Sequence, residues 1–179
     1  LWFANTWSWG CRPAAEDACG IRPMLKADAA GVVAASHPTL GKYRLTAERA
    51  PDGSHPELLF TENDTNRERL WRAPNDSPYV KDSFHERVIH GRTQAVTPEQ
   101  RGTKAAAWYR LEVSAAQSVT LRLRLRKAES SAQPTFGREF DLILAERQRE
   151  ADEFYLSRGH ASLSSEERRI ARQSAAGLL

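Results

Sequence analysis

The spacing of the apolar residues changes once along the chain, near residue 130. In residues 119–127 apolar and polar side chains alternate, which is the period of a half-buried β-strand. From Phe136 to Phe154 the apolar residues recur instead at steps of three and four, which is the period of an amphipathic helix. A chain that carries the two periods in separate parts is predicted to be an α+β protein, with its strands first and its helices after them.

Other segments extend this pattern in both directions. The segment 11–31 has no clear period and is interpreted as a loop, and further strands are predicted at 32–35, 42–48, 57–61 and 107–113. A short polar segment separates 107–113 from 119–127 and favours a hairpin between them. Ser164 and Glu167 have the spacing of a helix start, so a second helix is predicted after them.

These elements suggest a division of the chain. Residues 1–128 are expected to form a β-sandwich-type domain with a long polar loop at 62–102, 129–135 a linker, and 136–179 a helical domain. The aromatic start at Leu1 and the helix that ends on Leu178 and Leu179 are unlike the polar ends of most domains. We therefore expect the 179 residues to be a piece of a longer protein.

Charge and composition exclude several partners. The net charge is only +3, and no apolar run approaches the ~18 residues of a membrane span, so neither a membrane nor a nucleic acid is expected as a partner. Three arginines, Arg122, Arg124 and Arg126, share one face of the predicted strand 119–127. We interpret them as a solvated outer face; salt-dependent binding of a polyanion is the alternative.

Motifs for common chemistry are absent from the sequence. It has no Gly-x-Ser-x-Gly, phosphate loop or dinucleotide fingerprint, so no cofactor is expected. Cys11 and Cys19 have no clustered histidines nearby, which argues against zinc; they are expected as free thiols, with a loop disulfide as the alternative. No charged segment followed by an apolar stretch opens the chain, and a cytoplasmic location is predicted.

Two groups of polar residues in the segment 62–102 are candidates for function. The first follows the predicted strand 57–61, and its carboxylates and amides could hold sugar hydroxyls or simply satisfy an Asx-rich turn. The second precedes and enters a predicted helix at 82–89, where Asp82, His85 and Glu86 would share a face. The candidate residues are Glu62, Asn63, Asp64, Asn66, Lys81, Asp82, His85 and His90, and none is assigned a metal.

Several phrases, taken in order, resemble the glucosidase-like proteins of glycoside hydrolase family 63, which include relatives of the eukaryotic mannosyl-oligosaccharide glucosidase and bacterial homologues. The phrases are those of residues 1–9, 58–66, 79–82, 102–107 and 150–155. The resemblance implies a β-sandwich domain packed against an (α/α) six-hairpin barrel. It also implies an inverting hydrolase that acts on α-glucosidic or related bonds.

The resemblance further implies that the catalytic acids lie in the barrel, which would begin at about residue 137 of this chain. The chain itself is then expected to hold no catalytic residue and to be inactive alone. Its partners would be the missing barrel domain and, through the whole protein, an oligosaccharide. The eight polar candidates would contact the sugar or pack between the domains. The alternative is a stand-alone carbohydrate-binding module that uses an aromatic platform of Trp2, Trp7, Trp9, Trp71 and Trp108.

Overall fold

The computed structural model describes residues 1–3, 22–129, 135–158 and 162–177. The chain forms two compact units, Leu1–Ala132 and Gln133–Leu179. Within these described ranges the first unit holds all the strands and the second holds two helices, which confirms the predicted α+β class. Cys11 and Cys19, with Trp7 and Trp9 of the expected aromatic platform, lie outside the described residues.

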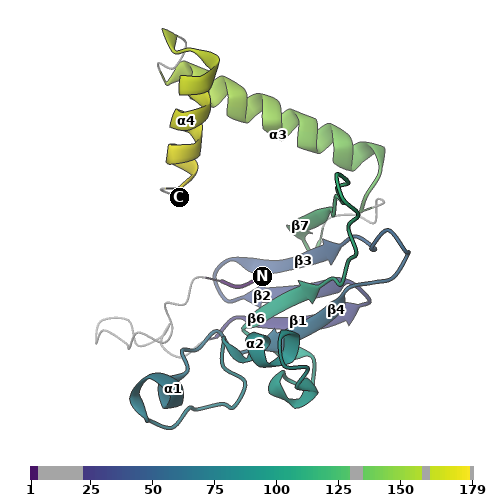
Figure 1. The fold of residues 1–179 in the computed structure, drawn as a ribbon, viewed down its shortest axis with the longest axis vertical. Helices are drawn as coiled ribbons and strands as arrows, with labels where there is room; N and C mark the ends of the chain where they lie inside the picture. The colour runs from purple at the N-terminus through teal and green to yellow at the C-terminus, as the bar shows by residue number, and fades with distance from the viewer. Residues whose placement is uncertain (4–21, 130–134, 159–161, 178–179) are drawn as a thin grey trace. The chain divides into compact units, whose positions relative to one another are not determined.

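The larger sheet of the first unit has five antiparallel strands in the order β5-β1-β2-β3-β7, of which β1, β2, β3 and β7 are labelled in Figure 1. The strands are β1 (Met24–Ala29), β2 (Val32–His37), β3 (Gly41–Ala47), β5 (Arg101–Gly102) and β7 (Leu123–Lys127). Gly31 makes the tight turn from β1 to β2 with a φ of 71°, where a side chain would be strained.

A second sheet pairs β4 (Glu57–Thr61) with β6 (Lys104–Trp108), and Trp2 adds an isolated bridge to Lys104. The two sheets share one core. Leu25, Val33 and Ala35 of the larger sheet form a buried cluster with residues 60 and 105 of the smaller one. This arrangement places the end of β4 and the start of β6 beside the polar segment that follows β4.

That polar segment contains three short helices, α1 (Arg67–Trp71), α2 (Ser83–Val88) and the 3-10 helix η2 (Thr93–Ala95). The predicted helix at 82–89 is confirmed as α2, whereas α1 was not predicted. Asn66 caps α1, because its side chain accepts a hydrogen bond from the Arg69 amide. The segment is therefore more regular than the expected long loop.

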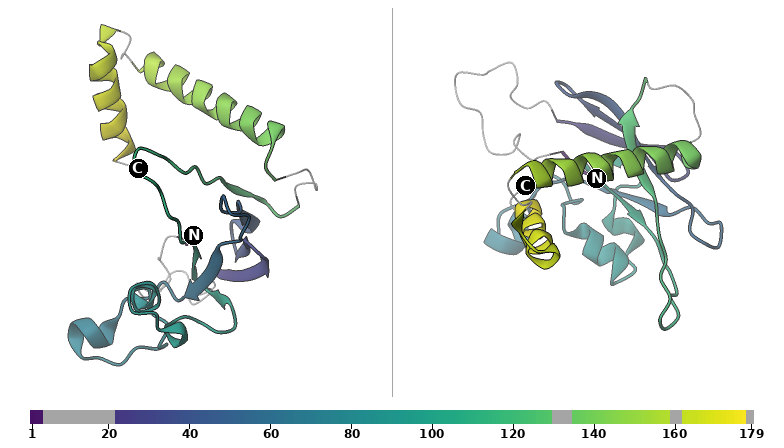
Figure 2. Two further views of the ribbon diagram at one scale, coloured as in Figure 1. Left: turned by 45° about the vertical axis from the view of Figure 1, so that its right-hand side comes forward. Right: turned by 90° about the horizontal axis from the view of Figure 1, so that it is seen from above.

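The second unit consists of α3 (Arg138–Ser157) and α4 (Ser165–Ala176), which Figure 2 shows in two further views. Ser164 begins α4 with a complete capping box to Glu167, as the sequence predicts. Neither helix buries a residue within the part of the unit that the structure describes, and an ion pair between Arg172 and Asp152 joins them. No described helix is both long and apolar enough to cross a bilayer.

The predicted hairpin between 107–113 and 119–127 is wrong. β6 pairs with β4 and β7 pairs with β3, so the two segments belong to different sheets. Alternation of apolar residues shows that a segment is half-buried in a sheet, but it does not select the strand that it pairs with. Residues 109–122 lie outside the strands, and β7 begins only at Leu123.

Two further expectations need correction. The lack of a clear period predicts a loop over 11–31, but the end of this segment forms β1, in which Leu25 is fully buried. The leucines of β7 lie on the core side of the sheet, because Leu125 is the register partner of Leu45. They are nevertheless 54% exposed at Leu123 and 53% exposed at Leu125, since the buried core cluster draws its residues from β1, β2, β4 and β6.

Candidate functional site

The end of β4 brings the two groups of polar candidates together. The Glu62 amide donates to the Tyr79 carbonyl at 2.7 Å, and the Lys81 amide donates to the Asp64 carbonyl at 3.0 Å. These backbone bonds hold the segments 62–64 and 79–81 side by side. Asp64 and Lys81 consequently line the same cavity, although 17 positions separate them in the sequence.

This cavity, which we call the Asp64 pocket, has a volume of about 710 Å³. Its wall includes Trp2, Asn63, Asp64, Trp71, Lys81 and Lys104. The two tryptophans are exposed by 59% and 64%, so part of each side chain is accessible to a ligand. Carboxylate, amide and ammonium groups together with aromatic faces suit a ligand that is polar at its edges and apolar on its faces.

Asp64 is the most unusual residue of the pocket. Its Oδ2 atom accepts a hydrogen bond from the Arg22 guanidinium at 2.8 Å. Its Oδ1 atom is buried and has no hydrogen-bond partner within the described part of the chain. A buried polar atom without a partner carries a desolvation cost, which a hydroxyl donor from a ligand would offset.

Two lysines supply positive charge to the same pocket. Lys81 donates from Nζ to the Thr65 hydroxyl at 3.0 Å. Lys104 lies over the rings of Trp2 and Phe84, at 5.2 and 5.7 Å from the ring centroids. Burial lowers the pKa of Lys104, and the positive charge of Lys81 lowers it further. Both ammonium groups are hydrogen-bond donors, and both lysines line the pocket.

Glu62 and Asn63 are bonded to Thr103, and these bonds position the backbone next to the pocket. The Thr103 hydroxyl donates to Glu62 Oε2 at 2.7 Å and accepts from the backbone amide of Asn63 at 2.7 Å. Glu62 also lies 3.5 Å from the Arg22 guanidinium, which Asp64 shares. The Thr103 bonds fix the backbone at the end of β4, next to Asp64.

Asn66 and Asp82 form a separate network that holds α1. The side chain of Asn66 accepts a hydrogen bond from the side-chain amide of Asn75 at 3.0 Å and donates one to Asp82 Oδ2 at 3.2 Å. The Arg69 guanidinium donates to the same Asp82 oxygen at 3.3 Å. Asp82 Oδ1 is also buried without a hydrogen-bond partner among the described residues, but Asp82 does not line the Asp64 pocket. The structure supports the Asx-turn interpretation for Asn66.

His85 and His90 lie apart from the pocket. Both are exposed, His85 on α2 and His90 just after it, and neither lines the cavity. Among the described residues no group of three or more histidine, cysteine, aspartate or glutamate side chains could hold a metal ion.

Sequence reasoning missed Arg22 and Lys104. Arg22 precedes β1 in a segment that was interpreted as a loop, and its charge carries no periodic signal. Lys104 stands within one of the family-like phrases, but only the pairing of β6 with β4 brings it near Lys81. Both residues are placed by long-range contacts, which local patterns do not encode.

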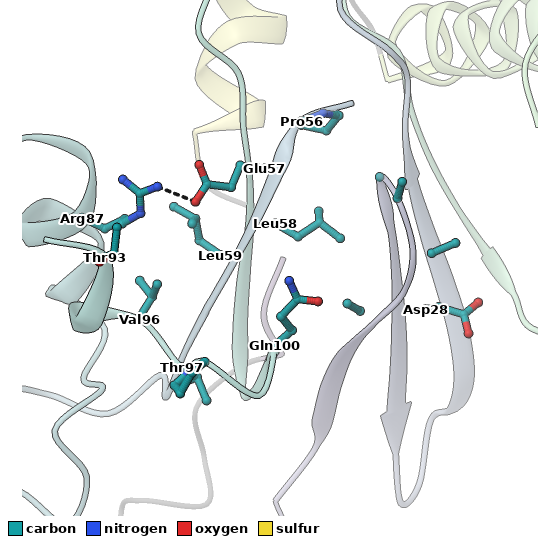
Figure 3. Close-up of a pocket in the computed structure, with 15 residues that line it drawn as sticks. Asp28, Pro56, Glu57, Leu58, Leu59, Arg87, Thr93, Val96, Thr97 and Gln100 are labelled. Atoms are coloured by element: carbon teal, nitrogen blue, oxygen red, sulfur yellow. Dashed lines mark hydrogen bonds and ion pairs between the residues drawn. The ribbon is translucent and has the colours of Figure 1, made fainter. Parts of the chain in front are cut away.

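A second cavity of about 640 Å³ lies between β4, the turn from β1 to β2 and the segment 93–100 (Figure 3). The Arg87 guanidinium and the Glu57 carboxylate form an ion pair of 2.6 Å at its side. Gln100 lines the cavity and has a φ of 51°, an unusual value for a residue with a side chain. None of the candidates named from the sequence lines this cavity.

Comparison with known proteins gives one similar curated protein and no family. The uncharacterized protein YMR196W of Saccharomyces cerevisiae is 33% identical over 208 residues, covering 100% of this chain and 18% of the yeast protein. The chain thus spans less than a fifth of that relative. No family model matches the chain. No solved structure matches it either.

Proposed function

We propose that this chain is a non-catalytic part of a longer inverting glycoside hydrolase that acts on α-glucosidic or related bonds. In this proposal the Asp64 pocket holds one sugar unit of the oligosaccharide substrate. Two findings support it: the ordered resemblance to family 63 glucosidases and the chemistry of the pocket. The extent of the yeast relative, of which the chain covers 18%, is consistent with a longer parent protein.

The observation that carries the proposal is the Oδ1 atom of Asp64. It is buried and has no hydrogen-bond partner among the described residues, while Oδ2 accepts from the Arg22 guanidinium at 2.8 Å, and the residue lines the pocket. The Arg22 contact sets the direction of this carboxylate before a ligand arrives, and a hydroxyl that gains access to Oδ1 would supply its missing donor. Sugar hydroxyls are donors of the matching kind, and binding costs less when the acceptor is preorganised.

The other groups of the pocket complete the match to a sugar. A pyranose ring has apolar C–H faces, which pack against aromatic rings, and Trp2 and Trp71 stand exposed at the cavity. Lys81 and Lys104 are donors for the acceptor lone pairs of the same hydroxyls. The cavity of about 710 Å³ falls within the usual range for a small-molecule site.

Catalysis is assigned outside this chain. Inverting hydrolysis uses a proton donor and a base about 6.5–9.5 Å apart with a water between them. In the family that the chain resembles, these groups belong to the barrel. The purified 179-residue chain is therefore expected to show no turnover of an aryl α-glucoside, and measurable turnover that copurifies with the chain would refute this assignment.

Substitutions of Asp64 and Asp82 in the longer enzyme distinguish a sugar-binding role from a packing role. Asp64→Asn keeps the size of the side chain but weakens the acceptor, so we expect a KM raised about tenfold in a well-folded protein. Asp82→Asn disturbs the network around Asn66 and Arg69, so we expect lower thermal stability with unchanged kinetics. If Asp64→Asn instead lowered stability and left KM unchanged, the pocket would be a packing site.

A stand-alone carbohydrate-binding module is the second candidate. The exposed rings of Trp2 and Trp71 favour it, because such modules bind sugars on aromatic surfaces without any partner domain. The flanking gene sequence separates the two candidates: a following segment that encodes an acid-bearing helical barrel supports the hydrolase.

A further inference from the structure

The outer face of the five-stranded sheet carries a row of cations in register. Arg101 of β5 is the register partner of Lys26 in β1, Lys26 of Ala34 in β2, and Ala34 of Arg44 in β3. Arg126 of β7 is the next partner in the row. Register partners point to the same face of a sheet, and this face is opposite to the one that buries Leu25 and Val33.

A row of like charges lowers the stability of the folded sheet unless carboxylates or a bound anion offset the repulsion. Lys26 and Arg101 stand directly opposite each other on neighbouring strands, about 4.8 Å apart at the backbone, and like charges in that position repel. Asp28 neutralises part of the row through its 3.1 Å ion pair with Arg44. Among the described residues no carboxylate lies within ion-pair distance of Lys26, Lys42 or Arg101.

The same cations surround a cavity of about 580 Å³, which we call the outer groove. Lys26, Lys42, Arg44 and Arg101 line it together with a single acid, Asp28. Ala34 lies between Lys26 and Arg44 in the row, and its small side chain leaves the space between the two cations open. Since neighbouring strands are ~4.8 Å apart, Lys26 and Arg44 flank an opening of roughly 10 Å.

We propose that the outer groove binds a small polyphosphorylated anion. Four cations from three strands, β1, β3 and β5, line one hollow, and their long side chains can reach several phosphate oxygens at once. One phosphate group would engage only part of the set, so the ligand is expected to carry at least two. The groove lies on the face opposite to the core, and the proposal is independent of sugar binding in the Asp64 pocket.

Calorimetric titration of the 179-residue chain with inorganic tripolyphosphate tests the proposal. We expect saturable binding that weakens as salt rises, because the charges of the groove are exposed to screening. Lys26→Gln and Arg101→Gln are each expected to weaken binding about tenfold, the loss of one charge-assisted contact. Inorganic phosphate is expected to bind more weakly than tripolyphosphate.

Lys127→Gln is the matched control. Lys127 is the register partner of Tyr43, so it lies on the other face of the same sheet, and it does not line the groove. The substitution Lys127→Gln therefore removes one positive charge, as Lys26→Gln does, but leaves the groove unchanged. Its binding constant should stay within about twofold of the wild type. If Lys127→Gln and Lys26→Gln weakened tripolyphosphate binding equally, the binding would depend only on net charge and the proposal would be overturned. A wild-type protein that binds no tripolyphosphate would also overturn it.

Thermal unfolding adds a readout that does not depend on the ligand assay. If the cations serve binding, removing Arg101 relieves repulsion from Lys26, and Arg101→Gln should leave Tm unchanged or raise it. Tripolyphosphate should raise the Tm of the wild type more than that of Arg101→Gln. A clear drop in Tm for Arg101→Gln without ligand would assign the row a structural role and contradict the proposal.

Discussion

A side chain at position 102 would collide with Thr61: a Cβ atom built on Gly102 lies 2.4 Å from the carbonyl oxygen of Thr61. Thr61 ends β4 and is fully buried, and the Thr103 amide donates to the same carbonyl at 3.1 Å. Gly102 thus allows β5 to approach β4 just where the backbone turns toward the Asp64 pocket. The requirement is one of space, since Gly102 is not among the glycines with positive φ.

Gly102→Ala is therefore expected to lower the free energy of unfolding by about 1–3 kcal/mol, the usual cost of forcing extra volume into a packed site. Urea unfolding followed by fluorescence measures the change. Gly177→Ala is the control, because a Cβ there has no atom closer than 3.5 Å and the backbone has no positive φ. Equal stability of Gly102→Ala and the wild type would mean that β5 does not pack as described.

Arg87 ties α2 to the smaller sheet. Its side chain is 14% exposed, pairs with Glu57 at 2.6 Å (Figure 3) and lies 4.9 Å from the ring centroid of Trp108. Arg87→Met should cost about 1–2 kcal/mol of stability, since an ion pair and a cation–π contact are both lost.

Arg110→Met is the matched variant for Arg87→Met. Arg110 also lies 4.9 Å from the Trp108 ring, but it is exposed, so its removal should cost about 0.5 kcal/mol. Chemical denaturation of both variants measures the difference. Equal losses would show that the burial and the carboxylate partner of Arg87 add nothing.

Tyr109 makes the stability of the first unit depend on pH in the alkaline range. Its hydroxyl donates to the Glu48 carbonyl; burial raises the pKa of Tyr109, and the negative charge of Glu48 raises it further. A raised pKa in the folded state contributes stability that is complete below the unfolded value of 10.0 and is lost as pH rises through the folded pKa.

Tyr109→Phe should therefore lower stability by about 1 kcal/mol at neutral pH. The stability of the wild type should fall more steeply than that of the variant as pH rises above 10.0. Unfolding curves across this range measure both effects. Tyr79→Phe serves as the control, because the Tyr79 hydroxyl has no hydrogen bond to another described residue. A parallel pH dependence for Tyr109→Phe and the wild type would contradict the assignment.

The sequence was sufficient for elements whose signal is local. The alternation of 42–48, the run at 57–61, and the Ser164–Glu167 spacing each predicted an element that the structure contains. It was insufficient for the pairing of strands, because the partner of β6 is β4 rather than the segment that follows in sequence. The weak pattern of β1 also hid Leu25, whose burial depends on both sheets.

The residues of the candidate site also fall into those that local sequence patterns predict and those that depend on long-range contacts. Asp64 and Asn63 were found because carboxylates and amides cluster after a strand, and both line the pocket. Asn66 and Asp82 share that composition but cap a helix that was not predicted. Arg22 and Lys104 were missed, since their positions depend on contacts that only the folded chain makes.

Sugar binding at Asp64 is tested most directly by saturation-transfer NMR of maltose with the 179-residue chain. We predict saturation transfer to maltose with the wild type, and loss of most of that signal in Asp64→Asn with Tm unchanged. Asp28→Asn, which removes the same charge on the outer face of the sheet, should retain the wild-type signal. Equal signals from the wild type and Asp64→Asn, or no transfer to maltose from the folded wild type, would contradict the account.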